Sequence, residues 1–101
     1  MVRRARKIIW TEKAIQSRKS IFQYWNTRNK STLYSKKLNR LFTEALVLVS
    51  KFPVSPITSQ IDNVRLKLVG YYQIIYEITE TEIIVHYIWD SRQNPQNFPI
   101  E

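Results

Sequence analysis

The fold is decided by residues 71–90, YYQIIYEITETEIIVHYIWD. Two runs rich in β-branched and aromatic residues, 72–78 and 83–89, are separated by a polar stretch around Glu80 and Thr81, which is typical of two strands joined by a turn. A turn that pairs Ile78 with Ile83 gives the hairpin one wholly apolar face. The other pairs on that face are Tyr76 with Val85, Ile74 with Tyr87, and Tyr72 with Trp89. The segment therefore predicts an antiparallel hairpin with one buried face.

The preceding residues, 64–68, read as a third strand of the same meander. A three-residue loop, Val69-Gly70-Tyr71, joins this strand to the hairpin, with Gly70 available for a positive φ. This loop places Val64, Leu66 and Leu68 on the apolar face. The opposite face is expected to carry Arg65, Lys67, Gln73, Ile75, Glu77, Ile84, His86 and Ile88.

Upstream of the meander, the apolar residues recur at helical spacing. Thr11 can cap a helix that begins at Glu12 and runs to about residue 25. Ser31 or Thr32 can cap a second helix that ends near Phe52, before Pro53. The expected apolar positions are Ala14, Ile15, Ile21, Phe22 and Trp25 in the first helix, and Tyr34, Leu38, Leu41, Ala45, Leu48 and Phe52 in the second.

A short strand at 6–10 precedes the first helix, and residues 52–63 read as an irregular crossover. With 44% hydrophobic residues in 101, the chain can build one core. The sequence therefore predicts a single α+β domain spanning residues 1–101. Its expected order is an N-terminal strand, an antiparallel helical hairpin, and a three-stranded antiparallel meander packed on the hairpin.

Composition excludes several classes of function. The chain has no Cys and one Gly, so thiolate ligands and glycine-rich phosphate loops are excluded. No metal-ligand spacing or serine elbow is present, so we expect no metal and no cofactor. The apolar run Ile8–Trp10 is too short for a signal-peptide core, and no stretch is long enough to span a membrane. We expect a cytoplasmic protein that does not enter membranes.

Charge is divided unevenly along the chain. Residues 1–52 hold thirteen Lys or Arg against Glu12 and Glu44, whereas the remainder holds three against six acids, giving +11 and −3. Such clustering favours docking to an acidic protein or to nucleic acid, although a merely solvated basic face is the alternative. The candidate docking residues are Arg18, Lys19, Lys36, Lys37 and Arg40.

A second, smaller set of basic residues could catalyse a reaction. Arg65 and Lys67 are expected on the same strand face, with His86 across the sheet and Arg92 just beyond the last strand. Metal-free RNA cleavage needs cations to hold the phosphate and a group such as His to move protons. The alternatives are that His86 is an ordinary strand residue, that Arg65 and Lys67 keep the face soluble, and that Arg92 simply pairs with Asp90.

Three segments carry a resemblance to a known family: KIIWT at 7–11, YQIIYEI at 72–78 and IWDSRQNP at 88–95. Together with the order of elements, they make the chain similar to the RelE/ParE superfamily of bacterial toxins from toxin–antitoxin modules. The resemblance implies a growth-inhibiting toxin in a hetero-oligomer with a cognate acidic antitoxin.

RelE-like members cut messenger RNA in the ribosome, and Arg65, Lys67 and Arg92 match their functional residues. Gln73 stands where those members carry another arginine, and Phe98 where they carry a tyrosine. ParE-like members inhibit DNA gyrase without cutting RNA. Ribosome-associated mRNA cleavage is the favoured expectation, with Arg65, Lys67, His86 and Arg92 as catalytic residues. Gyrase inhibition and a binding-only protein that has lost toxicity are the alternatives, so enzyme activity stays open.

Overall fold

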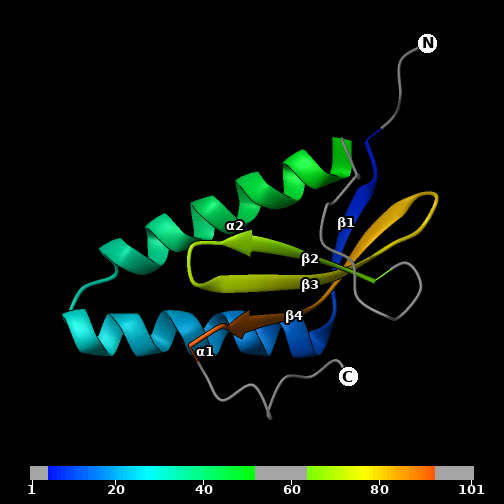
Figure 1. Ribbon diagram of the computed structural model, residues 1–101. Coiled ribbons are helices and arrows are strands. Elements are labelled where there is room, and N and C mark those ends of the chain that lie inside the picture. Colours follow the sequence, from blue (N-terminus) through cyan, green and yellow to red (C-terminus); the bar gives the residue numbers. More distant parts are fainter. Residues whose placement is uncertain (1–4, 52–63, 93–101) are drawn as a thin grey trace.

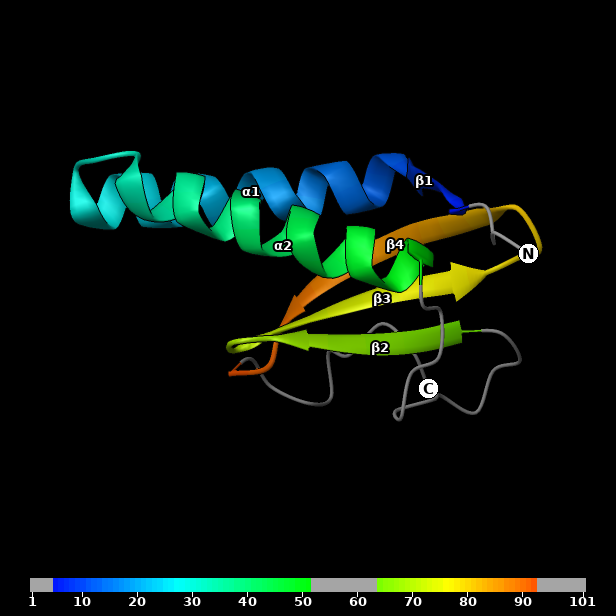
Figure 2. The same cartoon turned by 90° about the horizontal axis from the view of Figure 1, so that it is seen from above.

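The computed structural model describes residues 5–51 and 64–92 and confirms the expected α+β architecture (Figure 1). In chain order, the elements are β1 (Lys7–Trp10), α1 (Glu12–Asn29), α2 (Leu33–Lys51), β2 (Val64–Val69), β3 (Tyr72–Ile78) and β4 (Glu82–Asp90). Figure 2 shows both helices on one side of the sheet, here called the helix face. The opposite side is called the far face.

The four strands form one sheet in the order β1-β4-β3-β2. β2, β3 and β4 are the antiparallel meander, and β1 adds to its edge parallel to β4, with Ile8 beside Ile83 and Trp10 beside Val85. The N-terminal strand is therefore an edge strand of a sheet whose other three strands come from residues 64–90.

Both helices of the hairpin begin at an identifiable local signal, and α1 also ends at one. The Thr11 hydroxyl accepts a hydrogen bond from the Ala14 N–H at 3.1 Å, as the sequence predicts for an N-cap. α1 continues to Asn29, four residues further than expected, and stops where Lys30 adopts the left-handed conformation at φ 51°. The Ser31 hydroxyl accepts from the Leu33 N–H, so one of the two expected caps of α2 is present.

The main core lies between the hairpin and the helix face. Ala14, Leu38, Phe42, Leu46 and Val49 are buried there against the sheet. The predicted stripe of α2 is therefore partly wrong, because Leu48 is 52% exposed while its neighbour Val49 is buried. In α1, Ile21, Phe22 and Trp25 pack on the core as expected, whereas Ile15 is 40% exposed.

The register of the β3–β4 hairpin agrees with the prediction only next to its turn. Ile78 pairs with Ile83 and Tyr76 with Val85, as expected, but a bulge follows between Ile75 and Tyr76. One extra residue in β4 reverses the faces of the residues beyond it. Tyr87 and Trp89 consequently lie on the far face and Ile88 in the core, the reverse of the prediction.

The β2–β3 register is also one residue away from the prediction. The turn contains two residues, Gly70 and Tyr71, so Val69 rather than Leu68 pairs with Tyr72. Gly70 has the expected positive φ, +60°. Since a one-residue shift turns every side chain of a strand to the other side, Val64 and Leu66 lie on the far face. Arg65 and Lys67 therefore lie on the helix face.

The outer edge of β4 is closed by two different neighbours. β1 covers it as far as Val85 and then ends, and α1 covers the rest. The Thr11 hydroxyl donates to the Val85 carbonyl at 3.1 Å, and the buried Ser17 hydroxyl accepts from the Ile88 N–H at 3.0 Å. The Ser17 hydroxyl thus satisfies a backbone group where a strand partner is missing, whereas the Val85 carbonyl also accepts from the Thr11 N–H at 3.1 Å.

We predict that Ser17→Ala lowers the free energy of unfolding by about 1–3 kcal/mol, because the buried Ile88 N–H would lose its acceptor. Urea denaturation followed by circular dichroism measures this change. Ser20→Ala, at an exposed position about one turn further along α1, is the matched control and should change stability by less than about 0.5 kcal/mol. Equal stabilities of the two variants would contradict the role of Ser17.

Candidate functional site

The four candidate catalytic residues do not lie on one face of the sheet. Arg65 and Lys67 are on the helix face, opposite Tyr76 and Ile74 of β3. His86 is on the far face, where its Nε2 lies 3.0 Å from Glu77 Oε1. The expectation that they share a surface is wrong, because the β2–β3 turn is one residue shorter than predicted.

His86 sits at the bulge of β4 and makes a surface pair with Glu77. The two side chains are 41% and 37% exposed. Contacts of this kind between exposed side chains contribute little to stability. The Glu77 carboxylate therefore occupies one of the two ring nitrogens of His86, Nε2.

Arg92 belongs to a cluster just beyond the C-terminal end of β4. Its Nε and Nη2 donate to the two carboxylate oxygens of Asp90 at 3.0 and 2.8 Å. The ion pair proposed from sequence as the alternative role of Arg92 is therefore present. The hydrogen bond from Arg92 holds the pKa of Asp90 below its ordinary value, and the same bond raises the pKa of Arg92.

Trp25 of α1 is the centre of this cluster. The guanidinium groups of Arg92 and Arg28 lie 5.6 and 5.7 Å from the centroid of its ring, within the range of cation–π attraction. Its indole N–H donates to the Tyr72 hydroxyl at 2.7 Å. Tyr24 and Tyr34 pack edge-on against it. The indole thus connects α1, α2, β3 and the residues after β4.

The Tyr72 hydroxyl keeps its proton at neutral pH. Burial raises the pKa of Tyr72, although the hydrogen bond from Trp25 acts in the opposite direction. Because the phenol oxygen accepts the indole N–H, its own proton remains for an acceptor in the adjoining pocket. That pocket, of ≈ 340 Å³, is lined by Ser20, Ile21, Tyr24, Tyr72, Asp90 and Arg92.

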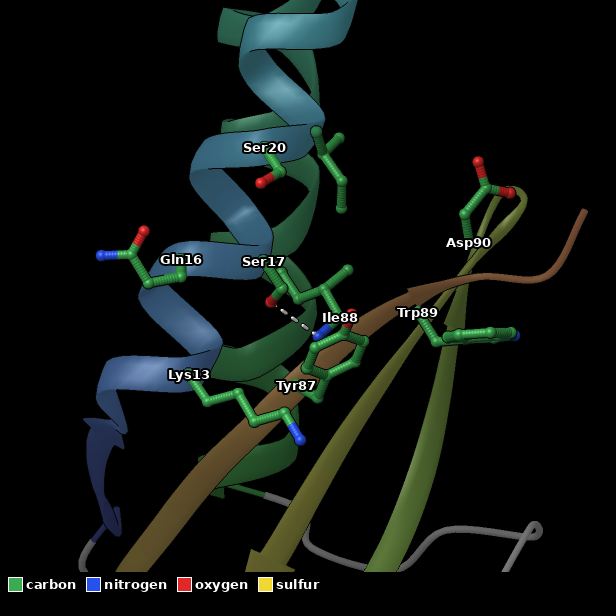
Figure 3. Close-up of a pocket in the computed structure, with 9 residues that line it drawn as sticks. Lys13, Gln16, Ser17, Ser20, Tyr87, Ile88, Trp89 and Asp90 are labelled. Atoms are coloured by element: carbon green, nitrogen blue, oxygen red, sulfur yellow. Dashed lines mark hydrogen bonds between the residues drawn. The ribbon is translucent and has the colours of Figure 1, made fainter. Parts of the chain in front are cut away.

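A second pocket, of ≈ 210 Å³, adjoins the first along the contact between α1 and β4 (Figure 3). Lys13 and Tyr87 face each other at one end, where the ammonium lies 5.3 Å from the ring centroid. Asp90 stands at the other end, and the Ser17–Ile88 hydrogen bond crosses between them. Trp89 lies beside Tyr87 on the far face, with the two ring centroids 6.4 Å apart.

The predicted docking cations lie on the helical hairpin. Arg18, Lys19 and Lys36 line a groove of ≈ 600 Å³ between α1 and α2, whose apolar wall includes Ile15 and Phe22. The guanidinium of Arg18 also lies 4.2 Å from the centroid of the Trp10 ring. Lys37 and Arg40 are exposed on α2. The hairpin therefore gathers three of the five predicted residues in one groove.

Sequence reasoning missed the cluster around Trp25. Its members come from α1, α2, β3 and the residues after β4, so no single segment shows the pattern. A local signal was present, because Arg28 follows Tyr24 by four residues and such pairs meet on a helix. The Arg28 side chain indeed donates to the Tyr24 hydroxyl at 3.3 Å.

Neither a metal-binding cluster nor a membrane-spanning helix is found in the part of the chain that the structure describes. Within residues 5–51 and 64–92, no group of three or more His, Asp or Glu could hold a metal ion. No helix in these ranges is long and apolar enough to cross a membrane.

We predict that the Asp90–Arg92 pair stabilises the fold in a pH-dependent way. Because the pKa of Asp90 is lower in the folded protein, its contribution is complete above the ordinary value of about 4 and is lost as the pH falls through the folded pKa. The difference in unfolding free energy between the native chain and Asp90→Asn should therefore shrink between pH 7 and pH 2. Arg92→Gln should show the same trend, and a difference independent of pH in both variants would contradict the pair.

Comparison with solved structures supports the fold. A chain described as "Chromosomal ParDE TA system from P. aeruginosa" superimposes with a TM-score of 0.69 over 83% of this chain and 94% of the other, at 15% sequence identity. At that identity the likeness concerns the fold alone. No curated protein sequence matches the chain.

The family model described as "ParE toxin of type II toxin-antitoxin system, parDE" matches residues 8–95. The match covers every helix and strand except the first residue of β1. It also agrees with the superfamily that the segments at 7–11, 72–78 and 88–95 resemble. The chain belongs to the ParE toxin family of type II toxin–antitoxin systems, in which a toxin is paired with an antitoxin.

Proposed function

We propose that this toxin inhibits growth by docking on DNA gyrase and that it does not cut messenger RNA. The observation that carries the proposal is the separation of the candidate catalytic cations between the two faces of the sheet. Ribosome-associated RNA cleavage, favoured by the sequence, needs those residues at one phosphate.

The chemistry explains why the separation matters. Metal-free cleavage of RNA requires a proton-transfer group within hydrogen-bond reach of the reacting oxygens and cations around the phosphate. His86 reaches the far face, whereas Arg65 and Lys67 are on the helix face. Arg92 is already bonded to Asp90 through two of its nitrogens. This arrangement supports binding rather than catalysis.

The helical hairpin is the surface best suited to docking. Nine lysines and arginines lie in α1, α2 and the residues between them, against Glu12 and Glu44. Clustered positive charge increases the rate of association with an acidic partner. We propose that the antitoxin is acidic and neutralises the toxin by covering this charge.

The proposal predicts that the purified toxin blocks DNA supercoiling by gyrase and leaves ribosome-bound messenger RNA intact. His86→Ala should retain growth inhibition within about twofold, whereas loss of a true proton-transfer residue would reduce activity about 10²–10⁴-fold. Growth assays with mapping of mRNA ends measure both quantities.

The charge-reversal pair Lys36→Glu and Lys37→Glu tests the docking surface in the same assays. We expect weaker gyrase inhibition in at least the Lys36 variant, because Lys36 lines the groove between the helices. Ribosome-dependent mRNA cleavage that disappears in His86→Ala would instead establish a nuclease. Absence of any growth effect in the native chain would identify a binding-only protein.

A further inference from the structure

We propose that the groove between α1 and β4 binds an extended acidic peptide that carries one carboxylate at each end of the groove. The seam groove consists of the pocket of ≈ 210 Å³ drawn in Figure 3 and the adjoining pocket of ≈ 340 Å³. The two pockets share Ser20, Ile21 and Asp90. The proposal rests on the acidic antitoxin proposed above but not on gyrase as the target.

The seam groove runs along one stripe of α1. Lys13, Ser17, Ser20, Tyr24 and Arg28 are spaced three or four residues apart, so they lie on the same side of the helix. The groove exists because β1 ends at Trp10 and a helix, which is wider and rounder than a strand, takes its place beside β4. It is distinct from the groove between α1 and α2, which Lys19 and Gln23 line.

One net positive charge lies at one end of the seam groove and another lies beside its other end. At the first end, Lys13 lies over the Tyr87 ring, which leaves the ammonium protons for an acceptor. At the second end, Arg92 of the groove lining is paired with Asp90, and Arg28, which lines neither pocket, adds a positive charge on the Trp25 ring beside them. Arg92 Nη1 takes no part in the Asp90 pair, so it can donate to an incoming carboxylate.

The middle of the seam groove suits a peptide backbone. Gln16 and Ser20 are exposed there and offer both donors and acceptors. Ile21 and Ile88 provide an apolar floor. The Ile88 N–H is already bonded to Ser17, so the ligand would meet side chains of the groove rather than pair with β4 as a fifth strand.

The length of the groove determines the spacing of the two carboxylates. Lys13 and Tyr24 are eleven residues apart on α1, which is about 16 Å at 1.5 Å per residue. An extended chain advances about 3.3 Å per residue, so five steps cover this distance. The expected ligand therefore carries acidic residues at positions 1 and 6.

The test uses two capped hexapeptides of equal net charge, one with Glu at positions 1 and 6 and Ser between, and one with both Glu residues at positions 3 and 4. Each peptide is titrated into the ¹⁵N-labelled full chain, and binding is followed by NMR through the indole N–H signal of Trp25. This signal reports on the groove because the indole donates to the hydroxyl of Tyr72, which lines the groove. The first peptide should bind at least about threefold more tightly than the second. Equal affinities would overturn the predicted spacing.

Matched variants locate the site. Lys13→Glu should weaken binding of the first peptide about fivefold, which is the size expected for exposed charge pairs. Lys51→Glu, with the same charge change at an exposed position of α2 that lines neither groove, should not weaken it. Ser20→Trp should block the groove, and Lys19→Glu and Gln23→Trp probe the competing groove between the helices. Circular dichroism confirms that each variant is folded.

Three outcomes would overturn the proposal. Equal weakening by Lys13→Glu and Lys51→Glu would mean that only net charge matters. Weakening by the Lys19 and Gln23 variants alone would place the peptide between the helices. Tighter binding of a single-stranded DNA hexamer at the same Trp25 signal would assign the groove to nucleic acid. None of these results depends on whether gyrase is inhibited.

Discussion

The rest of the structure depends on how the outer edge of β4 is closed. This strand pairs with β3 on one side, while its other side receives β1 as far as Val85 and α1 beyond it. The change of neighbour is possible because the Ser17 hydroxyl accepts from the Ile88 N–H, which would otherwise be buried without a partner, and because Thr11 donates to the Val85 carbonyl through both its N–H and its hydroxyl. The same two residues fix the position of α1, and α1 in turn supplies Trp25 and the stripe along the seam groove.

Register decides where the charges of the sheet are found. A two-residue turn at Gly70-Tyr71 directs Arg65 and Lys67 to the helix face, and the bulge near His86 reverses the outer half of β4. Neither feature changes the composition or the order of elements that the chain shares with its family. The fold of the family can therefore be retained while Arg65 and Lys67 lie on one face of the sheet and His86 on the other.

The sequence predicted the elements well, because their signals are local. The Thr11 cap, the three strands of the meander and the Asp90–Arg92 pair each follow from residues close together in the chain. The registers were missed because turn length and a bulge depend on packing against the helices. The stripe of α2 was misplaced because residues 45–49, ALVLV, are apolar all round, so periodicity does not select Val49 over Leu48. The Trp25 cluster could not be predicted from the sequence, because only the tertiary fold brings its members together.

The parallel pairing of β1 with β4 has a consequence for how the molecule forms. Lys7 lies beside Glu82, so the sheet joins segments 75 residues apart, and such distant contacts slow folding relative to a helical protein of the same size. On the ribosome, the hairpin of α1 and α2 is made first, but the edge strand has no partner until residues 82–85 have emerged. β1 therefore has no strand partner during most of the synthesis of the chain. During that period its β1 edge is open to other chains, and a binding partner made nearby could reach the toxin before its fold is complete.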